Sequence, residues 1–262
     1  MTSNRWRALA LLVPLVVLAA ACGDTDDTAS DQPAEQVDGP TVSFSKPADG
    51  AHVAGGVLVE MVADGITIEP AGEVHEGAGH FHVIADDGCV DPGSAVPKDA
   101  DHIHFGKAQT SGTIYLGPGE HDLCLQPGDG IHVALEPTDR ITVDVGVRDR
   151  DEWCGVIKEV DDLFLAADTS SDEFAVRQGK YEGIRRLIAQ LTDGISQVDA
   201  TARTAVATSL AQASSIAGTF ADAADQAAAE AALQAVYGAE GAKQDPAAVT
   251  WIKDTCSVDI DS

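Results

Sequence analysis

Histidines supply the chemistry that this sequence shows most readily. All eight histidines of the 262-residue chain lie between positions 52 and 132. Two pairs have the spacing His-x-His, namely His80 with His82 and His102 with His104. Residues two apart on an extended strand point to the same side, so each pair can present two imidazoles to one point. Neutral imidazole is a good ligand for Zn²⁺, Cu²⁺ and Ni²⁺.

These spacings predict a transition-metal site, for copper or zinc. The candidate ligands are the two pairs and two histidines near later turns: His80, His82, His102, His104, His121 and His132. Asp101, Glu120 and Asp122 flank them, as further ligands or as acceptors that orient the imidazoles. His52 and His75 are expected in loops outside the site. The alternative is that the histidines are structural and bond to one another and to carboxylates.

The cysteines indicate an oxidising compartment. If Cys22 is used for an anchor, four cysteines remain, which in an exported protein predict two disulfides with three possible connectivities: Cys89, Cys124, Cys154 and Cys256. We favour Cys89–Cys124 and Cys154–Cys256, because each pair then stays within one predicted domain. A blue-copper site would need a cysteine thiolate and usually a methionine. We do not favour it, because Cys124 has a use as a disulfide partner.

The N-terminus has the zones of an export signal. Two arginines precede an apolar run at 8–20, which is short for a permanent membrane span, and three alanines then precede Cys22. A cysteine at this place resembles the bacterial lipobox, in which the thiol receives a diacylglyceryl group. We therefore expect residues 1–21 to be a lipoprotein signal peptide and Cys22 to carry a lipid on the extracytoplasmic face of the membrane. Ala19 stands where the lipobox usually has Leu, and the alternative is an ordinary secreted protein.

The mature chain is predicted to be strongly acidic. Residues 22–39 have the composition of an acidic disordered tether. The formal net charge is −27, and removal of residues 1–21, which hold two arginines and no acid, brings it near −29. Such a surface repels nucleic acid and favours cations, so we expect no nucleic-acid partner. After Ala21 the sequence has no apolar stretch long enough to cross a membrane, which leaves the lipid as the expected anchor.

The whole chain is predicted to be an α+β multidomain protein. Residues 40–150 are expected to form an antiparallel β-sandwich of immunoglobulin-like or cupredoxin-like build, because short alternating segments are separated by Pro/Gly turns. The candidate strands are 41–45, 57–63, 66–68, 80–85, 113–116, 122–125, 131–135 and 141–147. This is the domain that must position the histidines.

Residues 151–262 are predicted to form an α-helical bundle. Apolar residues recur at helical spacing, and the expected helices cover about 153–164, 172–191, 200–220, 222–237 and 245–252. Ser170 and Glu173 are placed as a capping box, and Asp245-Pro246 as an N-cap followed by proline at the first helical position. This part has no cluster of ligand-type residues, so we interpret it as structural or as the surface that docks an envelope protein partner.

The sequence carries no common catalytic signature. It has no Gly-x-Ser-x-Gly elbow, no phosphate-binding loop and no His-Glu-x-x-His helix. We therefore expect no enzymatic activity. A metal-dependent enzyme is the remaining alternative, and it would need an open coordination position.

Five segments in order resemble one bacterial family. They are Phe-Ser-Lys-Pro-Ala-Asp-Gly-Ala at 44–51, Gly-Ala-Gly-His-Phe-His at 77–82, His-Ile-His-Phe-Gly-Lys-Ala-Gln-Thr at 102–110, Leu-Gly-Pro-Gly-Glu-His-Asp-Leu at 116–123 and Gly-Asp-Gly-Ile-His at 128–132. Together they are similar to the domain-of-unknown-function 4399 family of short exported β-domains, over about residues 41–148.

The resemblance implies the β fold and the histidine set, and no activity. The family tends to have a third histidine where Phe81 stands and glycine where Ala108 stands. The helical half resembles, more loosely, disulfide-closed helical domains of actinobacterial lipoproteins, through Trp251 to Cys256.

Overall fold

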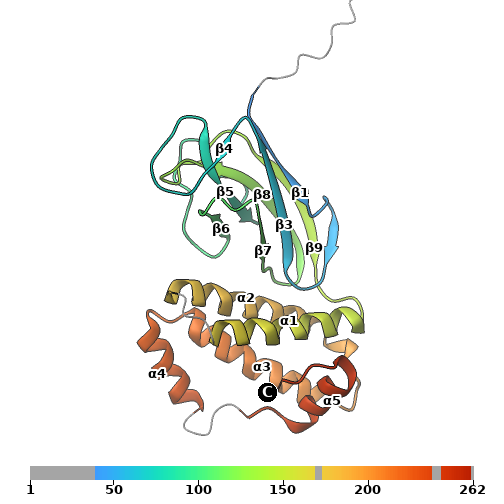
Figure 1. Ribbon diagram of the computed structural model, residues 1–262. Coiled ribbons are helices and arrows are strands. Elements are labelled where there is room, and N and C mark those ends of the chain that lie inside the picture. The colour runs from blue at the N-terminus through green and yellow to red at the C-terminus, as the bar shows by residue number, and fades with distance from the viewer. Residues whose placement is uncertain (1–38, 169–172, 238–242, 261–262) are drawn as a thin grey trace, which may run out of the picture. The chain divides into compact units, whose positions relative to one another are not determined.

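The computed structural model describes residues 39–168, 173–237 and 243–260 (Figure 1). Strands come first and helices second, so the predicted α+β class is confirmed. The expected signal peptide, most of the expected tether, and Cys22 lie outside the described residues, and the predicted domain boundaries stay predictions. Among the helices of the described part, none is long and apolar enough to span a membrane.

The strands form two sheets that share one core. The smaller sheet has the antiparallel order β1-β3-β7, with β1 at Thr41–Lys46, β3 at Val57–Asp64 and β7 at Ser111–Ile114. The larger sheet has the order β2-β9-β8-β5-β4, and β6 also pairs with β5. Its strands are β2 (Ala51–Val53), β4 (Thr67–Ile68), β5 (Ala78–Ala85), β6 (His102–Phe105), β8 (Gly119–Gly128) and β9 (Asp139–Val145).

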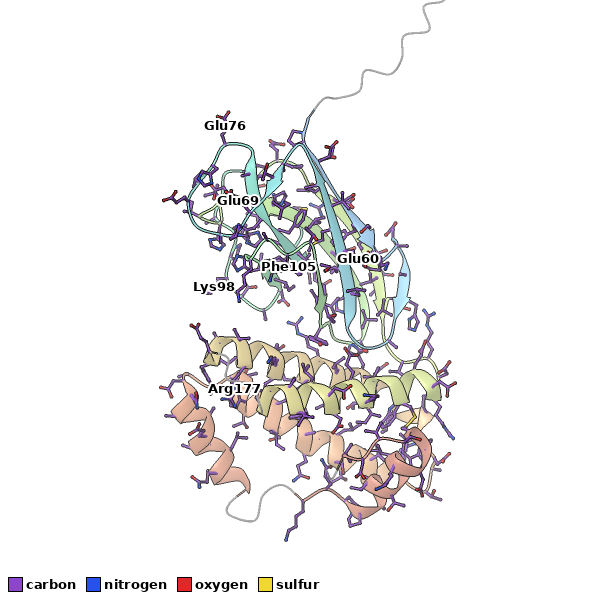
Figure 2. All side chains as sticks on the ribbon, viewed as in Figure 1. Glu60, Glu69, Glu76, Lys98, Phe105 and Arg177 are labelled. Atoms are coloured by element: carbon purple, nitrogen blue, oxygen red, sulfur yellow. A yellow bond between two sulfur atoms is a disulfide. The ribbon has the colours of Figure 1, made fainter. Side chains whose placement is uncertain are left out.

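The two sheets pack as a sandwich because each turns one apolar face inward. Val57 and Val59 from the smaller sheet lie in one buried cluster with Phe81, Leu125 and Val143 from the larger. Phe105 of β6 adds to the same core (Figure 2). The purely antiparallel prediction is wrong at the margins of the larger sheet, where the short strands β2 and β4 pair in parallel with β9 and β5.

The prediction of a strand at 131–135 is also wrong. The backbone of His132 is left-handed, with φ at 70°, which interrupts an extended chain. Ile131 is 63% exposed, so the alternation of apolar residues there does not reflect a buried face. Instead this segment folds back over the larger sheet, with isolated bridges from Val133 to Ala95 and from Ala134 to Gly128.

Strand β5 is buried on both faces, and this decides where the histidines lie. Phe81 and Val83 enter the sandwich core, so His80 and His82 point to the opposite, outer face of the larger sheet. Residues 90–96 and 132–135 bond to each other and to Gln126 on that face, and we call them the covering layer. The amide of Gln126 fastens this covering layer, since it bonds both the N–H and the carbonyl of Val90 as well as the carbonyl of Leu135.

The helical region has five α-helices among the described residues. They are α1 (Arg150–Asp168), α2 (Phe174–Asp193), α3 (Arg203–Ala221), α4 (Gln226–Tyr237) and α5 (Pro246–Cys256), with a 3₁₀ turn at Gly194–Gln197. Their core includes Trp153, Ile184, Leu187 and Phe220, each at most 2% exposed.

Two helix starts test the predicted caps. The Asp245 carboxylate accepts a hydrogen bond from the N–H of Ala247, and Pro246 follows it, so that cap is confirmed. At α2 the capping-box placement is wrong, because Glu173 is itself the N-cap residue and makes no side-chain capping bond. Ser170 lies outside the described residues.

Two disulfides and one buried amide join distant parts of residues 39–262, which form one compact unit. Cys89 pairs with Cys124 and Cys154 pairs with Cys256, the connectivity favoured above. The Gln190 side chain in α2 accepts from the N–H of Gly55 and donates to the carbonyl groups of Gly55 and Leu116. Two disulfides within the chain indicate an extracytoplasmic, oxidising compartment.

Candidate metal centre

Four histidines from three segments converge on the outer face of the larger sheet. His80 and His82 come from β5, His104 comes from β6, and His132 comes from the turn after β8. One ring nitrogen from each of the four lies within 4.8 Å of those of the other three. Nε2 of His104 and Nε2 of His132 lie 3.1 Å apart and form a hydrogen bond. We call these four residues the histidine cluster.

Strand register explains three of the four positions. His80 and His82 are two apart on β5 and share its outer face. The antiparallel pairing of β5 with β6 sets His104 directly opposite His82. Two glycines leave room for the rings. A Cβ at Gly128 would lie 2.8 Å from Cε1 of His82, and one at Gly106 would lie 2.1 Å from Cε1 of His104.

A capped turn supplies the fourth position. The Asp129 carboxylate accepts hydrogen bonds from the N–H groups of Ile131 and Val133, and the Asp129 carbonyl accepts one from the N–H of His132. These bonds hold His132 in its left-handed conformation. Such a conformation is unfavourable for any residue other than glycine, and residues that adopt it are often found at functional sites. Asp129 is therefore a positioning residue for the His132 imidazole.

Burial keeps the inner imidazoles neutral. His80 and His82 are at most 1% exposed, and burial lowers the pKa of His80 to about 4 and that of His82 to about 3. The neighbouring imidazoles lower both pKa values further, because two protonated rings this close would repel. Burial also lowers the pKa of His104. Near neutral pH the His80 and His82 rings are therefore uncharged, which is the form of imidazole that binds metal ions.

The inner imidazoles lack hydrogen-bond partners. Both ring nitrogens of His80 and the Nδ1 of His82 are buried and make no hydrogen bond to any described residue. Leaving a buried polar group unpaired costs about 1–3 kcal/mol. The structural alternative, in which the histidines bond to one another and to carboxylates, fits only in part. His104 and His132 bond to each other, but within the described residues no carboxylate bonds to any of the four rings. The donor set fits a metal ion.

The structure does not bring His102 or His121 to the cluster, which corrects the predicted convergence of both His-x-His pairs. His102 lies opposite Ile84, and its Nδ1 bonds Oδ1 of Asp99 at 2.7 Å. His121 bonds Asp86 through Nδ1 at 2.7 Å and the Gly117 carbonyl through Nε2 at 3.0 Å. Gln126 is the residue of β8 that pairs with His82. His121 lies five residues from Gln126 along β8, which is about 16 Å at the rise of an extended strand.

The remaining polar residues named from the sequence have other contacts. Asp101 forms an ion pair with Arg186, and the N–H of Asp122 donates to the Asp86 carboxylate. His75 lies in a loop and bonds Glu69, as expected. His52 lies in β2 rather than in a loop, and its Nε2 is 3.1 Å from a Glu152 carboxylate oxygen.

A blue-copper site is excluded by the cysteine chemistry. Cys124 is bonded to Cys89, so it offers no thiolate. Met61 points into the sandwich core and is 3% exposed, on the other side of the larger sheet from the cluster. The ligand set is purely imidazole.

Residues 59–146 match the family model described as "Domain of unknown function (DUF4399)". The match covers most of the strand region and about a third of the chain. The resemblance drawn from the sequence is thereby confirmed, and all four members of the histidine cluster lie inside the DUF4399 match. The family description assigns no activity.

Two further comparisons add little to the DUF4399 match. No curated protein matches the sequence. Among solved structures, the X-ray structure of the endo-beta-1,4-mannanase from Thermotoga petrophila is similar with a TM-score of 0.26 and 18% identity, over 44% of this chain and 21% of that chain. The chain thus matches about a fifth of that protein's length, and a likeness this weak carries no argument.

Proposed function

We propose that the strand region binds one transition-metal ion, copper or zinc, through His80, His82, His104 and His132. The observation that carries the proposal is the set of three buried imidazole nitrogens without hydrogen-bond partners inside a cluster of four histidines. A bound ion would use lone pairs that the fold otherwise buries at a cost. The purely nitrogen donor set suits Zn²⁺ and Cu²⁺.

The geometry supports this ligand set. Imidazole nitrogens about 2.0–2.1 Å from a zinc ion would lie about 3.3 Å apart in a tetrahedron. The His104 and His132 nitrogens are 3.1 Å apart, and the whole set lies within 4.8 Å. Modest ring rotations would therefore complete a site that the backbone already positions.

The role that we propose is capture or handover of the ion outside the cytoplasm, without catalysis. The two inner histidines are buried, whereas His104 is exposed and His132 is half-buried, so an ion can reach the cluster from one side. We further propose that a lipid on Cys22 holds the protein on the extracytoplasmic face of the membrane. The acidic charge would favour cations near the site.

Titration calorimetry and elemental analysis of untagged protein lacking residues 1–21 test the metal proposal. We expect about one equivalent of Zn²⁺ or Cu²⁺ bound with micromolar or tighter affinity. His80→Asn/His82→Asn should abolish binding, and the exposed His75→Asn should not change it. Equal binding by the wild type and the double variant would reject the site. Unchanged stability on adding metal, with a partner captured through the helical region, would favour an interaction module with structural histidines.

The mass of the mature N-terminus tests the anchor separately. We expect a chain that begins at Cys22 and carries diacylglyceryl and acyl groups. A chain cut elsewhere, or one with an unmodified Cys22, would leave the protein secreted without an anchor.

A further inference from the structure

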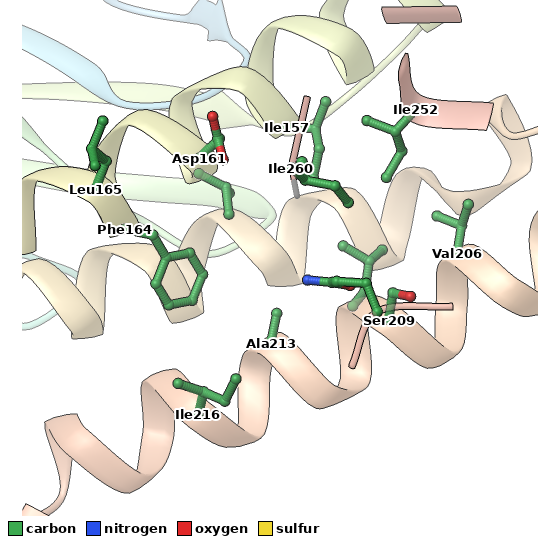
Figure 3. Close-up of a pocket in the computed structure, with 13 residues that line it drawn as sticks. Ile157, Asp161, Phe164, Leu165, Val206, Ser209, Ala213, Ile216, Ile252 and Ile260 are labelled. Atoms are coloured by element: carbon green, nitrogen blue, oxygen red, sulfur yellow. The ribbon is translucent and has the colours of Figure 1, made fainter. Parts of the chain in front are cut away.

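A pocket of about 270 Å³ lies between helices α1 and α3, and Gln244, Ile252 and Ile260 also line it (Figure 3). It is open to solvent on one side, since Leu165 in its lining is 63% exposed, so a ligand can enter it. We call it the α1/α3 slot.

Ten of the thirteen residues that line the slot are apolar. On α3 its lining runs from Val206 to Ile216, ten residues of helix or about 15 Å at the helical rise. Ile157 and Phe164 line it from α1, and Ile252 of α5 lines it as well. Figure 3 shows these side chains facing one another across the slot. Such a shape fits an extended aliphatic chain better than a compact ring system.

Polar groups interrupt the apolar lining. Ser209 is 6% exposed, and its Oγ makes no hydrogen bond to any described residue. The Oε1 of Gln244 is buried and equally without a partner there. Asp161 adds a carboxyl group to the lining. A natural core seldom leaves a hydroxyl and an amide oxygen unpaired, so these atoms indicate where a ligand's polar end lies.

We propose that the α1/α3 slot binds a single-chain lipid whose head group donates hydrogen bonds, such as a monoacylglycerol. The acyl chain lies along the apolar stretch of α3, and the head-group hydroxyls donate to Oε1 of Gln244 and to Oγ of Ser209 or the carboxylate of Asp161. This site is separate from the histidine cluster and does not depend on metal binding.

The charges around the slot select the head group. Burial and the nearby carboxylates of Asp162 and Asp259 all raise the pKa of Asp161, and only Lys158 opposes them. A ligand carboxylate would add a further negative charge at this place. A neutral hydroxyl head avoids that repulsion and still supplies the donors that the amide oxygen requires.

Calorimetric titration with monododecanoylglycerol, below its critical micelle concentration, tests the proposal. The chain from residue 22 onward with Cys22→Ser is used, so that no lipid of its own competes. We expect one site of micromolar affinity and binding of dodecanoate at least about tenfold weaker at pH 7.5, because of the extra charge. Ser209→Ala/Gln244→Ala should weaken the binding of monododecanoylglycerol about fivefold to tenfold, which is the effect of losing one or two hydrogen bonds.

Two matched substitutions on α3 test where the ligand binds. Ala213→Phe places a ring in the slot and should weaken binding at least about tenfold, whereas Ala207→Phe on the exposed side of the same helix should leave it unchanged. Near-ultraviolet circular dichroism and urea unfolding show whether each variant is folded. No binding to the wild type, equal binding by folded Ala213→Phe, or tighter binding of dodecanoate would overturn the proposal. If Ala213→Phe fails to fold, the Ser209/Gln244 variant and the head-group comparison decide.

Discussion

At the scale of single residues, Gly106 gives the sharpest control over the metal site. A methyl group there would meet both Cε1 and Nε2 of His104 at 2.1 Å, so the ring must rotate away. We expect Gly106→Ala to lower metal affinity by about tenfold or more, as displacement of a ligand does. The free energy of unfolding should change little, because the His104 ring is exposed and can move. Metal titration paired with urea unfolding measures both.

Gly117→Ala is the matched control for this substitution. A methyl group at Gly117 meets nothing within 4 Å, and its backbone is not left-handed. Metal affinity should therefore stay at the wild-type value. An equal loss in both variants would mean that His104 is not a ligand.

Asp129 is the second residue whose role can be separated from folding. Asp129→Ala removes two hydrogen bonds that hold the turn of His132. We expect a loss of about 1–2 kcal/mol in the free energy of unfolding and a 10–100-fold loss of metal affinity. Asp49→Ala also removes two hydrogen bonds, to the N–H and hydroxyl of Thr142, but lies away from the cluster. It should cost similar stability and no metal affinity. Equal affinities in the two variants would contradict the positioning role.

At the scale of elements, strand β5 should make stability depend on pH in the metal-free protein. The folded pKa values of His80 and His82 are about 4 and about 3, against an ordinary value near 6.5 in the unfolded chain. Between pH 4 and 6.5 the unfolded chain therefore binds protons that the folded chain does not. The stabilisation is complete above about pH 6.5 and is lost as the pH falls, by at most about 1.4 kcal/mol per pH unit for each histidine.

Urea unfolding between pH 7 and 5, with a chelator present, measures this dependence. The carboxyl groups with lowered pKa values, such as Asp99 and Asp199, titrate below this window. His80→Asn/His82→Asn should make the profile shallower and leave the contribution of His104, whose pKa is also lowered by burial. His75→Asn should not change the profile. Parallel profiles for the wild type and the double variant would show that the two imidazoles do not differ in protonation between the folded and unfolded states.

The segment 86–101 links the Cys89–Cys124 disulfide to the histidine cluster. Within it, the N–H of Val96 donates to the carbonyl of His132, and the N–H of Ala134 donates to the carbonyl of Ser94. The disulfide fixes the start of this segment to β8. The covering layer is therefore bonded both to the Cys89–Cys124 disulfide and to the backbone of His132.

At the scale of the whole molecule, the two disulfides should have different consequences. On the chain-entropy model, Cys89→Ala/Cys124→Ala should cost roughly 4 kcal/mol and Cys154→Ala/Cys256→Ala roughly 4–5 kcal/mol, since the separations are 35 and 102 residues. Only the first variant should also weaken metal binding, because it frees the segment that bonds to His132. Unfolding and metal titrations of both variants test this. Equal losses of metal affinity would mean that the coupling runs through global stability.

The sequence by itself determined the order of strands and helices, because apolar period and turn residues are local signals. The same-side placement of His80 and His82 also followed from the period of a strand. The cap at Asp245-Pro246 could be predicted for the same reason, because helix capping depends only on residues that are adjacent in sequence.

Only the tertiary structure decided which histidines meet. Strand register sets His104 opposite His82 and places His102 two pairs farther along, opposite Ile84. Register depends on residues that are distant in sequence. Alternating apolar residues at 131–135 predicted a strand, whereas the Asp129 cap turns the chain and recruits His132. The α1/α3 slot likewise depends on how whole helices pack, which no local pattern records. Local sequence patterns therefore identified the candidate histidines, and long-range packing determined which of them lie together.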